Sequence, residues 1–522
     1  MGDPSVSIEH DASVVPQPAS SVPVAADDDE PPSPHSPPRP IEISQSRNSE
    51  TQRDVVHAGG GGLITSLVRG RKAAISDEEK PEATLPNLTR GRTSAFSRSE
   101  RLRTLFTPQH TLGPAPSYRA SLVALIRYSP LNVFLFCVPT SWALHYSHQT
   151  PTVVFVFAAL GIVPLAALLG LGTEQIALHT SQCVGGLLNA TLGNLIELIV
   201  AGIALSRCDL DLVQSSLLGG LLSNLLLVLG MAFFAGGFRF HQQEFQPTVA
   251  QLNTSLMTLS VIALLVPAAF HEFLSEKIQA AEETPLLLTM SRGTAIVLLL
   301  IYIAYLFFQF YSHSHLFVDS VQQPTSRRSS TSSISTLGST LPLPTTSLAP
   351  SQRVEYPRMN IPSALALLSV ITGLAYITAE ILVDALDEVA EAAPFSKEFL
   401  TLIIIPIISN AAEHTTAVVV ASKGKFDLAL QVAVGSCIQI ALFVVPLLVL
   451  AAWGAGKPLS LVFDSLETLC LFFAVILVKF SVEDGRTHWM SGVILVAVYV
   501  VIALSFWNFP DNIGNDLGFV CT

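Results

Sequence analysis

Two short motifs place an amide side chain three residues before a carboxylate, each within strongly apolar sequence. Asn194 precedes Glu197 in the run GNLIEL, and Asn410 precedes Glu413 in the run SNAAEH. Residues three apart lie on the same face of a helix. Carboxylate and amide oxygens are the ligands that Ca²⁺ takes in proteins. The two motifs therefore predict a site for a divalent cation, built from these two carboxylates and two amides.

The apolar surroundings of Glu197 and Glu413 indicate what such a site would exchange. An ionised carboxylate at the centre of a membrane helix costs about 2.5–3.5 kcal/mol on insertion scales, and no Lys or Arg lies in the middle of either apolar segment. Protons or a bound divalent cation then remain to neutralise the pair. We therefore expect the cation and protons to compete for both carboxylates and to cross the membrane in opposite directions. The alternative is a pair of structural glutamates held by hydrogen bonds.

His414 follows Glu413 directly, and a histidine titrates near neutral pH. One interpretation is that His414 takes part in proton coupling together with Glu197 and Glu413. The other is that its ring only orients Glu413. The sequence leaves both interpretations open.

The two motifs belong to an internal duplication. Glu197 and Glu413 are 216 residues apart (413 − 197), and a second motif, GGLLS from Gly219 and GSCIQ from Gly435, keeps the same offset (435 − 219). Two motif pairs in one register indicate duplication rather than coincidence. Small residues in these motifs suit helices that are broken or closely packed near the site, although ordinary helix packing also uses them. These residues are Gly193, Gly219, Gly220, Gly435 and Ser436.

Other polar residues within or beside the apolar segments are candidates for an ion access path. Glu380 and Asp384 are four residues apart and share a helical face. Glu174 and Asp384 have an alternative role as interfacial residues that contact lipid headgroups. The full set of access-path candidates is Glu174, Glu380, Asp384, Gln214 and Gln431.

The elements that must position these residues are long apolar segments. Half of the 522 residues are hydrophobic and only 13% are charged, and a membrane helix needs about 20 apolar residues. The composition predicts an all-α membrane protein with about eleven transmembrane helices. The predicted segments are 130–147, 151–171, 183–206, 212–235, 249–270, 293–312, 361–383, 399–421, 427–452, 459–480 and 489–508.

The order of the segments predicts an inverted repeat. The second motif lies in 399–421, which comes five segments after 183–206, where the first motif lies. Because five is odd, the two motif segments cross the membrane in opposite directions. The expected architecture is one extra helix followed by two inverted five-helix repeats. Secondary transporters with this build place their site at the repeat interface near the bilayer midplane.

The polar parts of the chain complete the predicted domain organisation. Residues 1–115 are polar and predict a disordered cytosolic tail, which is either a regulatory phosphorylation region or a passive tail. The first transmembrane half spans 120–312 and the second 359–510. Between them, 313–358 is rich in Ser, Thr and Pro and predicts a flexible cytosolic linker. A short C-terminal tail covers 511–522.

The motif pair resembles that of the vacuolar calcium/proton exchangers of fungi and plants, within the calcium/cation antiporter superfamily. The run SNLLLVLG from Ser223 adds to the resemblance, which spans about residues 120–510. This chain has Leu195, Ser409 and Gly220 where the family usually has Ala, Gly and Ser. The resemblance implies a multi-pass protein of the vacuolar membrane that moves Ca²⁺ into an acidic lumen in exchange for protons. It also implies Mn²⁺ as a frequent second substrate.

Two other transport functions remain as alternatives. A sodium/calcium-type exchanger would use Na⁺ in place of protons, whereas His414 beside Glu413 favours protons. A cation channel can also line its path with acids, but an inverted duplication favours alternating access. No phosphate-binding loop, zinc-protease motif or basic nucleic-acid-binding face occurs in the sequence. We therefore expect neither an enzyme nor a resident cofactor, and the partners are lipid, Ca²⁺ and H⁺, with oligomerisation left open.

Overall fold

The computed structural model describes residues 112–275, 280–314, 316–317 and 356–509. All of them belong to one compact unit, Arg92–Thr522. Most of the predicted N-terminal tail (1–115), most of the predicted linker (313–358) and the whole predicted C-terminal tail (511–522) lie outside the described residues.

The described residues form a helical bundle, with one short antiparallel ribbon in which Gln243 of β1 lies opposite Thr487 of β2. The helices labelled η are a 3₁₀ helix (η1) and four π-helical turns. The bounds in chain order are α2 (Tyr118–Ile126), η1 (Pro130–Phe136), α3 (Cys137–Tyr146), α4 (Pro151–Leu178), α5 (Gln182–Leu192), α6 (Leu195–Arg207), α7 (Leu210–Leu222), η2 (Ser223–Val228), α8 (Leu229–Gly237), β1 (Gln243–Glu244), α9 (Pro247–Ser275), α10 (Ala280–Phe307), η3 (Phe308–Ser312), α12 (Ile361–Ala392), α13 (Lys397–Phe399), η4 (Leu400–Ile404), α14 (Ile405–Ser409), α15 (Ala411–Ser422), α16 (Phe426–Gln439), η5 (Ile440–Val444), α17 (Val445–Gly454), α18 (Ser465–Val482), β2 (Arg486–Thr487) and α19 (Trp489–Trp507).

Within the described part of the chain, eight helices are long and apolar enough to cross a membrane. Two bent pairs raise this number to ten: Tyr118–Ile126 with Pro130–Tyr146, bent by 89°, and Lys397–Ser409 with Ala411–Ser422, bent by 54°. The predicted segment 183–206 corresponds to α5 and α6, which are not among these ten. The all-α membrane fold is therefore confirmed, whereas the predicted count of eleven helices is not.

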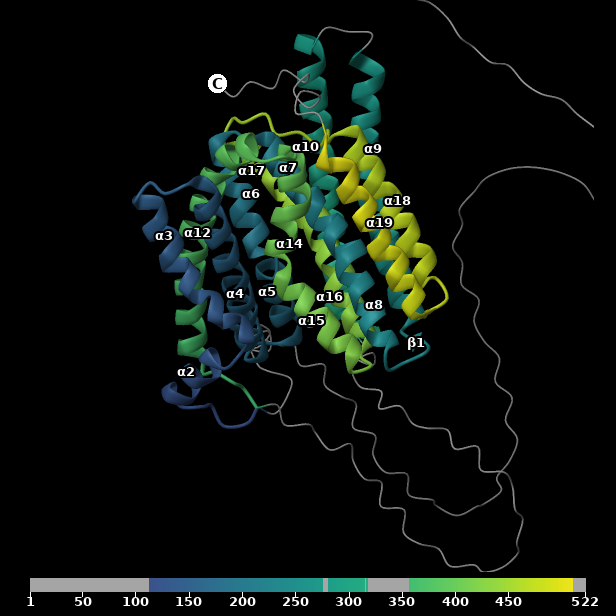
Figure 1. The fold of residues 1–522 in the computed structure, drawn as a ribbon. Coiled ribbons are helices and arrows are strands. Elements are labelled where there is room, and N and C mark those ends of the chain that lie inside the picture. Colours follow the sequence, from purple (N-terminus) through teal and green to yellow (C-terminus); the bar gives the residue numbers. More distant parts are fainter. Residues whose placement is uncertain (1–111, 276–279, 315, 318–355, 510–522) are drawn as a thin grey trace, which may run out of the picture. The chain divides into compact units, whose positions relative to one another are not determined.

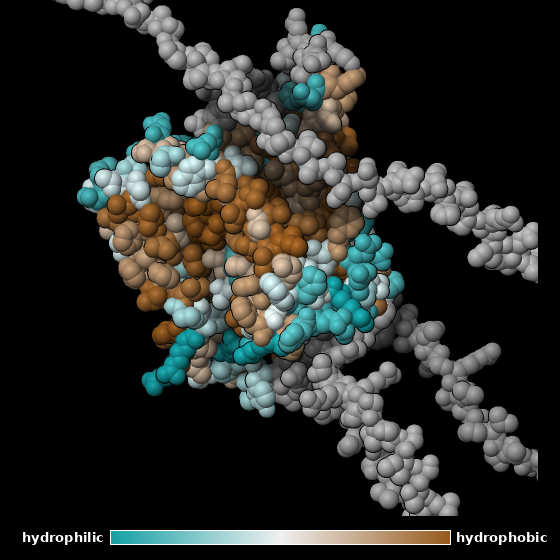
Figure 2. Space-filling model, turned by 45° about the vertical axis from the view of Figure 1, so that its right-hand side comes forward, coloured by the Kyte–Doolittle hydropathy of each residue, from teal (hydrophilic) through white to brown (hydrophobic). Residues whose placement is uncertain are grey.

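The outer surface of the bundle fits a lipid environment. Figure 2 shows a belt of apolar residues between two polar margins on one face. On α10, Val297, Leu300 and Ile303 recur every third residue and are 55%, 60% and 61% exposed. Exposing such a row of apolar side chains to water would be unfavourable in free energy. The hydrocarbon chains of lipids can cover the row instead.

Several helices are longer than the apolar segments that predicted them. The segment 151–171 becomes α4, which continues to Leu178, and 361–383 becomes α12, which continues to Ala392. A helix continues while its backbone hydrogen bonds form, even after the apolar sequence ends. As a result Glu174, predicted to follow its segment, lies inside α4, which packs against α3, α5 and α12 (Figure 1).

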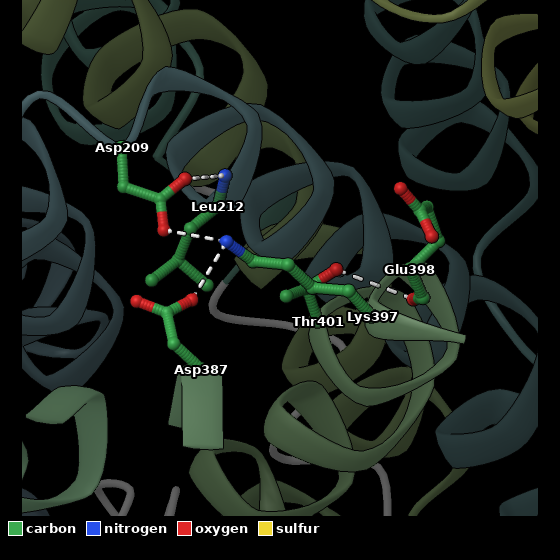
Figure 3. Close-up of polar contacts among 6 residues, drawn as sticks. All are labelled: Asp209, Leu212, Asp387, Lys397, Glu398 and Thr401. Carbon is green, nitrogen blue, oxygen red and sulfur yellow. Dashed lines mark hydrogen bonds and ion pairs between the residues drawn. The ribbon is translucent and has the colours of Figure 1, made fainter. Parts of the chain in front are cut away.

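Contacts between helix ends show that the two motif segments run in opposite directions. The ammonium of Lys397, at the start of α13, lies 3.0 Å from Oδ2 of Asp209, just after the end of α6, and 2.8 Å from Oδ1 of Asp387 on α12 (Figure 3). The segment of the first motif therefore ends where the segment of the second begins. We call this the acidic end of the bundle, defined by Asp209, Asp384 and Asp387.

The opposite end of the bundle gives the same result. Arg239, after α8, donates to the carbonyl of Ser422 at the end of α15 (3.2 Å), and Asp427, at the start of α16, accepts a hydrogen bond from the backbone of Gln246 (2.7 Å). The fourth and eighth segments thus end together, and the fifth and ninth begin there. These pairings are those of two inverted repeats.

We expect Lys397→Met to lower the thermal stability of the protein slightly. Lys397 and its two carboxylate partners are partly exposed, and an ion pair of this kind contributes about 1 kcal/mol or less. The expected loss in Tm is roughly 2 °C in detergent, and smaller in high salt. Lys425→Met is the matched control, because Lys425 is exposed and makes no ion pair with any described residue. Equal Tm losses in the two variants would contradict this prediction.

Candidate functional site

The backbone leaves the helical conformation at both asparagines of the motifs. Asn194 has φ −106° and ψ 36°, and Asn410 has φ −87° and ψ 11°. Each asparagine stands immediately before a new helix, α6 or α15, so Glu197 and Glu413 both lie in a first helical turn. The N-terminal end of a helix carries partial positive charge and favours a nearby carboxylate. Each half therefore presents its acid at the positive end of a broken helix.

The small residues predicted for the breaks and packing have different surroundings. Gly193 ends α5 at the first break, where a Cβ would lie 2.7 Å from the carbonyl oxygen of Asn189. A Cβ on Gly219 would overlap the carbonyl oxygen of Leu402 in η4. In contrast, a Cβ on Gly435 would meet only a side-chain carbon of Gln431, at 3.7 Å. Close backbone approach thus explains Gly193 and Gly219 but not Gly435.

A π-helical turn follows each glycine motif. η2 (Ser223–Val228) continues α7, and η5 (Ile440–Val444) continues α16, so the two turns occupy nearly corresponding places in the repeats. Single π-helical turns are rare within helices and frequent at functional sites. No residue type marks a π-helical turn, so these two turns are not predictable from the sequence.

The structure brings the two acids of the motifs together. Glu197 is only 8% exposed and Glu413 is partly buried, and the two carboxyl groups are close enough for mutual charge repulsion. Glu197 also contacts the hydroxyl of Ser409 from the other half. Within the described residues, no Lys, Arg or His forms an ion pair with either acid. The charge on this pair has to be balanced by something other than a protein cation.

Buried oxygens at the site lack hydrogen-bond donors. Oε1 of Glu197, Oε2 of Glu413 and Oδ1 of Asn410 have no partner in the described part of the protein. Buried polar atoms are normally satisfied, and Ca²⁺ binds carboxylate and amide oxygens. No group of three or more His, Cys, Asp or Glu among the described residues could hold a metal ion. The site therefore offers two carboxylates supplemented by neutral oxygens, and their role as cation ligands stays a prediction.

The amide of Asn194 is held by the second half of the molecule. Its Nδ2 donates to Oε1 of Gln439 (2.7 Å), and its Oδ1 accepts from the hydroxyl of Ser436 (2.6 Å). Ser436 also accepts from Nδ2 of Asn224 (3.3 Å). Ser436, predicted only as a packing residue, thus forms hydrogen bonds at the site. Gln439 and Asn224 were missed, although Gln439 is the last residue of the GSCIQ motif.

His414 contacts the backbone of its own helix. Its Nδ1 lies 2.5 Å from the carbonyl oxygen of Asn410, which can only accept, so Nδ1 carries the proton in this contact. Its Nε2 is buried and has no partner among the described residues. The ring therefore forms no hydrogen bond with Glu413, and the role of His414 in proton coupling stays a prediction.

The predicted access-path residues are dispersed. Arg207 pairs with Asp384 and lies 3.8 Å from Glu380 at the acidic end. Nε2 of Gln214 donates to the carbonyls of Ser460 (3.1 Å) and Val462 (2.9 Å), which ties α7 to the segment before α18.

The other two access-path candidates lie on helices of different halves. Glu174 is exposed on α4, and Gln431 is partly buried on α16. In the part of the chain that the structure describes, none of the five candidates forms a hydrogen bond or ion pair with Glu197 or Glu413. Their role in ion access stays a prediction.

Glu467 is a buried acid that the sequence analysis did not assign to any site. It lies in the first turn of α18, is buried, and hydrogen-bonds to Ser215 of α7. The signal was present, because an acid within an apolar segment is a candidate functional residue. It lacked a counterpart in the other half, which is why the repeat comparison did not single it out.

Comparison with known proteins provides independent evidence on the family and the fold. The family model described as sodium/calcium exchanger protein matches residues 150–311 and 363–508. The vacuolar calcium ion transporter of Cryptococcus neoformans var. grubii is 42% identical over 78% of this chain and 78% of its own length. A Ca²⁺/H⁺ antiporter of Synechocystis is 39% identical over 73% of this chain and 97% of its own. The solved structure of native YfkE aligns with a TM-score of 0.57 and 30% identity over 72% and 99% of the two chains. The chain therefore belongs to the sodium/calcium exchanger protein family.

Proposed function

We propose that this protein is a calcium/proton antiporter that moves Ca²⁺ from the cytosol into the acidic lumen of the vacuole. The observation that carries the proposal is the pair of interacting acids, Glu197 and Glu413, which have unpartnered oxygens and form no ion pair with a described Lys, Arg or His. The names of the relatives, a vacuolar calcium ion transporter and a Ca²⁺/H⁺ antiporter, support the substrate, the coupling ion and the membrane.

The mechanism follows from charge balance at this pair. Two carboxylates in a water-poor interior are neutralised either by a divalent cation or by protons. The site therefore cannot change from one side of the membrane to the other while it holds neither. Ca²⁺ is here the substrate, and no resident cofactor is required. Glu197 and Glu413 exchange the two kinds of ion, and Asn410 adds a neutral oxygen. The unpartnered Nε2 of His414, which follows Glu413 in the sequence, is a further candidate proton acceptor.

The inverted repeats supply the alternating access. Each acid lies on a different repeat, so a rocking of one repeat against the other opens the same site first to one side and then to the other. We assign the end with Arg239, Lys423 and Lys425 to the cytosol, because basic residues favour that side of a membrane. The acidic end then faces the lumen.

Sodium is the rival coupling ion, because the matching family model is named for sodium/calcium exchange. Two observations favour protons. His414, next to Glu413 in the sequence, has a buried ring nitrogen without a partner among the described residues, and the relatives with 39–42% identity include a named Ca²⁺/H⁺ antiporter. We propose Mn²⁺ as a second substrate, since it also prefers oxygen ligands.

The proposed function predicts that a pH gradient alone drives calcium uptake. Sealed vesicles with an acidic interior should take up ⁴⁵Ca²⁺, and a protonophore should abolish this uptake because the gradient supplies the energy. Lowering the external pH should raise the apparent KM for Ca²⁺, since protons compete for the same carboxylates. Uptake that ignores the protonophore and instead follows an imposed Na⁺ gradient would establish the rival function.

A further inference from the structure

The two asparagines of the site, although related by the repeat, differ in their hydrogen bonds. Both polar atoms of the Asn194 amide are engaged, the nitrogen by Gln439 and the oxygen by Ser436. Both polar atoms of the Asn410 amide lack a partner in the described part of the protein, although Asn410 is 0% exposed. One amide is therefore locked and the other is free.

The cause of this difference can be read from the repeat register. The residues that correspond to Ser436 and Gln439, 216 positions earlier, are Gly220 and Ser223. Gly220 has no hydroxyl to donate, and the hydroxyl of Ser223 forms no hydrogen bond with Asn410. A Cβ on Gly220 would lie 4.0 Å from Nδ2 of Asn410, so a serine hydroxyl at this position could reach the amide. Because neither polar atom of this amide has a partner among the described residues, the amide can turn by 180° and let Oδ1 accept from that hydroxyl. The absence of a side chain at position 220 leaves Asn410 unpartnered.

We propose that Gly220 makes the amide pair functionally asymmetric. Asn410 gives its side-chain oxygen to the transported divalent cation, whereas Asn194 is a positioning residue that Ser436 and Gln439 hold in place. This inference rests on the proposed function, because it concerns the ligands of the cation that the two acids bind.

The physical reason is the difference between the cation-free and cation-bound states. A buried amide oxygen without a donor is unfavourable when the site holds no cation, and a bound cation relieves this cost. The oxygen of Asn410 therefore gains a favourable interaction when the cation binds, whereas the oxygen of Asn194 already has one with the hydroxyl of Ser436. A hydroxyl at position 220 that donates to Oδ1 of the turned Asn410 amide would stabilise the cation-free state and so remove part of this gain.

The test compares Gly220→Ser with Gly220→Ala in the purified full-length protein. The dissociation constant for Ca²⁺ is measured by equilibrium ⁴⁵Ca²⁺ binding at neutral pH. We expect Gly220→Ser to raise it about tenfold, the factor that corresponds to one regained hydrogen bond at a buried group. Gly220→Ala should stay within about twofold, because its methyl group would meet Ile440 at 3.5 Å, an ordinary contact.

A second measurement separates this effect from misfolding. The calcium-free Tm of Gly220→Ser should rise above that of Gly220→Ala, because the buried amide gains a partner, whereas a misfolded variant would have a lower Tm. In the Asn410→Ala background, Gly220→Ser should no longer weaken calcium binding, as followed by calcium-dependent thermal shifts up to millimolar Ca²⁺.

Two results would overturn the inference: equal calcium affinity in Gly220→Ser and Gly220→Ala, or an effect of the serine that persists without Asn410. Neither result would contradict the proposed function, provided that vesicles with the wild-type protein show proton-driven uptake. Absence of wild-type uptake would instead contradict the proposed function itself.

Discussion

Replacing either acid of the site, by Glu197→Gln or by Glu413→Gln, should reduce proton-driven calcium uptake by at least about a hundredfold. Glutamine has nearly the same shape but no charge and no exchangeable proton. A divalent cation would then face a single carboxylate and keep an unbalanced positive charge in a buried site. Removing one partner of a buried charge pair costs about 3–5 kcal/mol, and each 1.4 kcal/mol is a factor of about ten in affinity.

The measurement is initial-rate ⁴⁵Ca²⁺ uptake into vesicles with an acidic interior, corrected for the amount of protein in the membrane. Glu388→Gln is the matched control, because Glu388 is an exposed acid on α12. It should retain uptake within about twofold. Because the two site variants remove mutual repulsion between buried acids, they should fold at least as stably as wild type. Substantial proton-driven uptake in either one would contradict the exchange mechanism.

A second large effect, on the stability of the protein, is expected from adding one methyl group at Gly219, in the packing around the site. Gly219→Ala places a Cβ on the carbonyl oxygen of Leu402 and 2.7 Å from its carbonyl carbon. Both neighbours are backbone atoms of η4 and cannot rotate away. Helix α7 would have to move from η4, and overpacking of this kind costs about 1–3 kcal/mol, occasionally more. We expect a Tm lower by roughly 5–10 °C and a corresponding loss of folded protein.

The repeat provides the matched control for Gly219→Ala. Gly435 occupies the corresponding position in the second half, yet its added Cβ would meet only Gln431 at 3.7 Å. Gly435→Ala should therefore be neutral or slightly stabilising, because alanine is favoured over glycine in a helix by about 0.8–1.0 kcal/mol. Size-exclusion profiles and thermal unfolding in detergent measure both variants. Similar destabilisation of the two would show that general glycine packing, and not the contact with Leu402, determines the effect.

The asymmetry of this site has a simple origin in duplication followed by divergence. The pairs Asn194 and Asn410, and Glu197 and Glu413, are unchanged between the repeats, whereas the residues around them differ. In the second half, Ser409 contacts Glu197, and Ser436 contacts Asn194. Their counterparts in the first half are Gly193 and Gly220, which have no side chain to return these contacts. Glu197 and Asn194 are therefore supported by more polar contacts than Glu413 and Asn410 are.

The sequence by itself determined the fold class and the duplication, and it predicted the residues of the site. Membrane helices are recognisable because hydropathy is a local property of about 20 residues. The opposite direction of the two motif segments followed from counting, since five is an odd number of crossings. The pairing of Lys397 with Asp209 bears this out. The acids themselves were evident because an uncompensated Glu within apolar sequence is costly and needs a reason.

Only the tertiary structure decided how the surrounding residues divide their roles. These roles depend on contacts between distant parts of the chain. Ser436 hydrogen-bonds to Asn194, and Arg207 pairs with Asp384. An added Cβ on Gly219 would meet a carbonyl group, whereas one on Gly435 would meet only a side-chain carbon. Such contacts depend on the rotation and depth of each helix against its neighbours. A shift of one residue in that packing changes every partner, and hydropathy and local spacing carry no information about it. The sequence thus specifies which groups enter the membrane, and packing specifies which of them remain free to bind an ion.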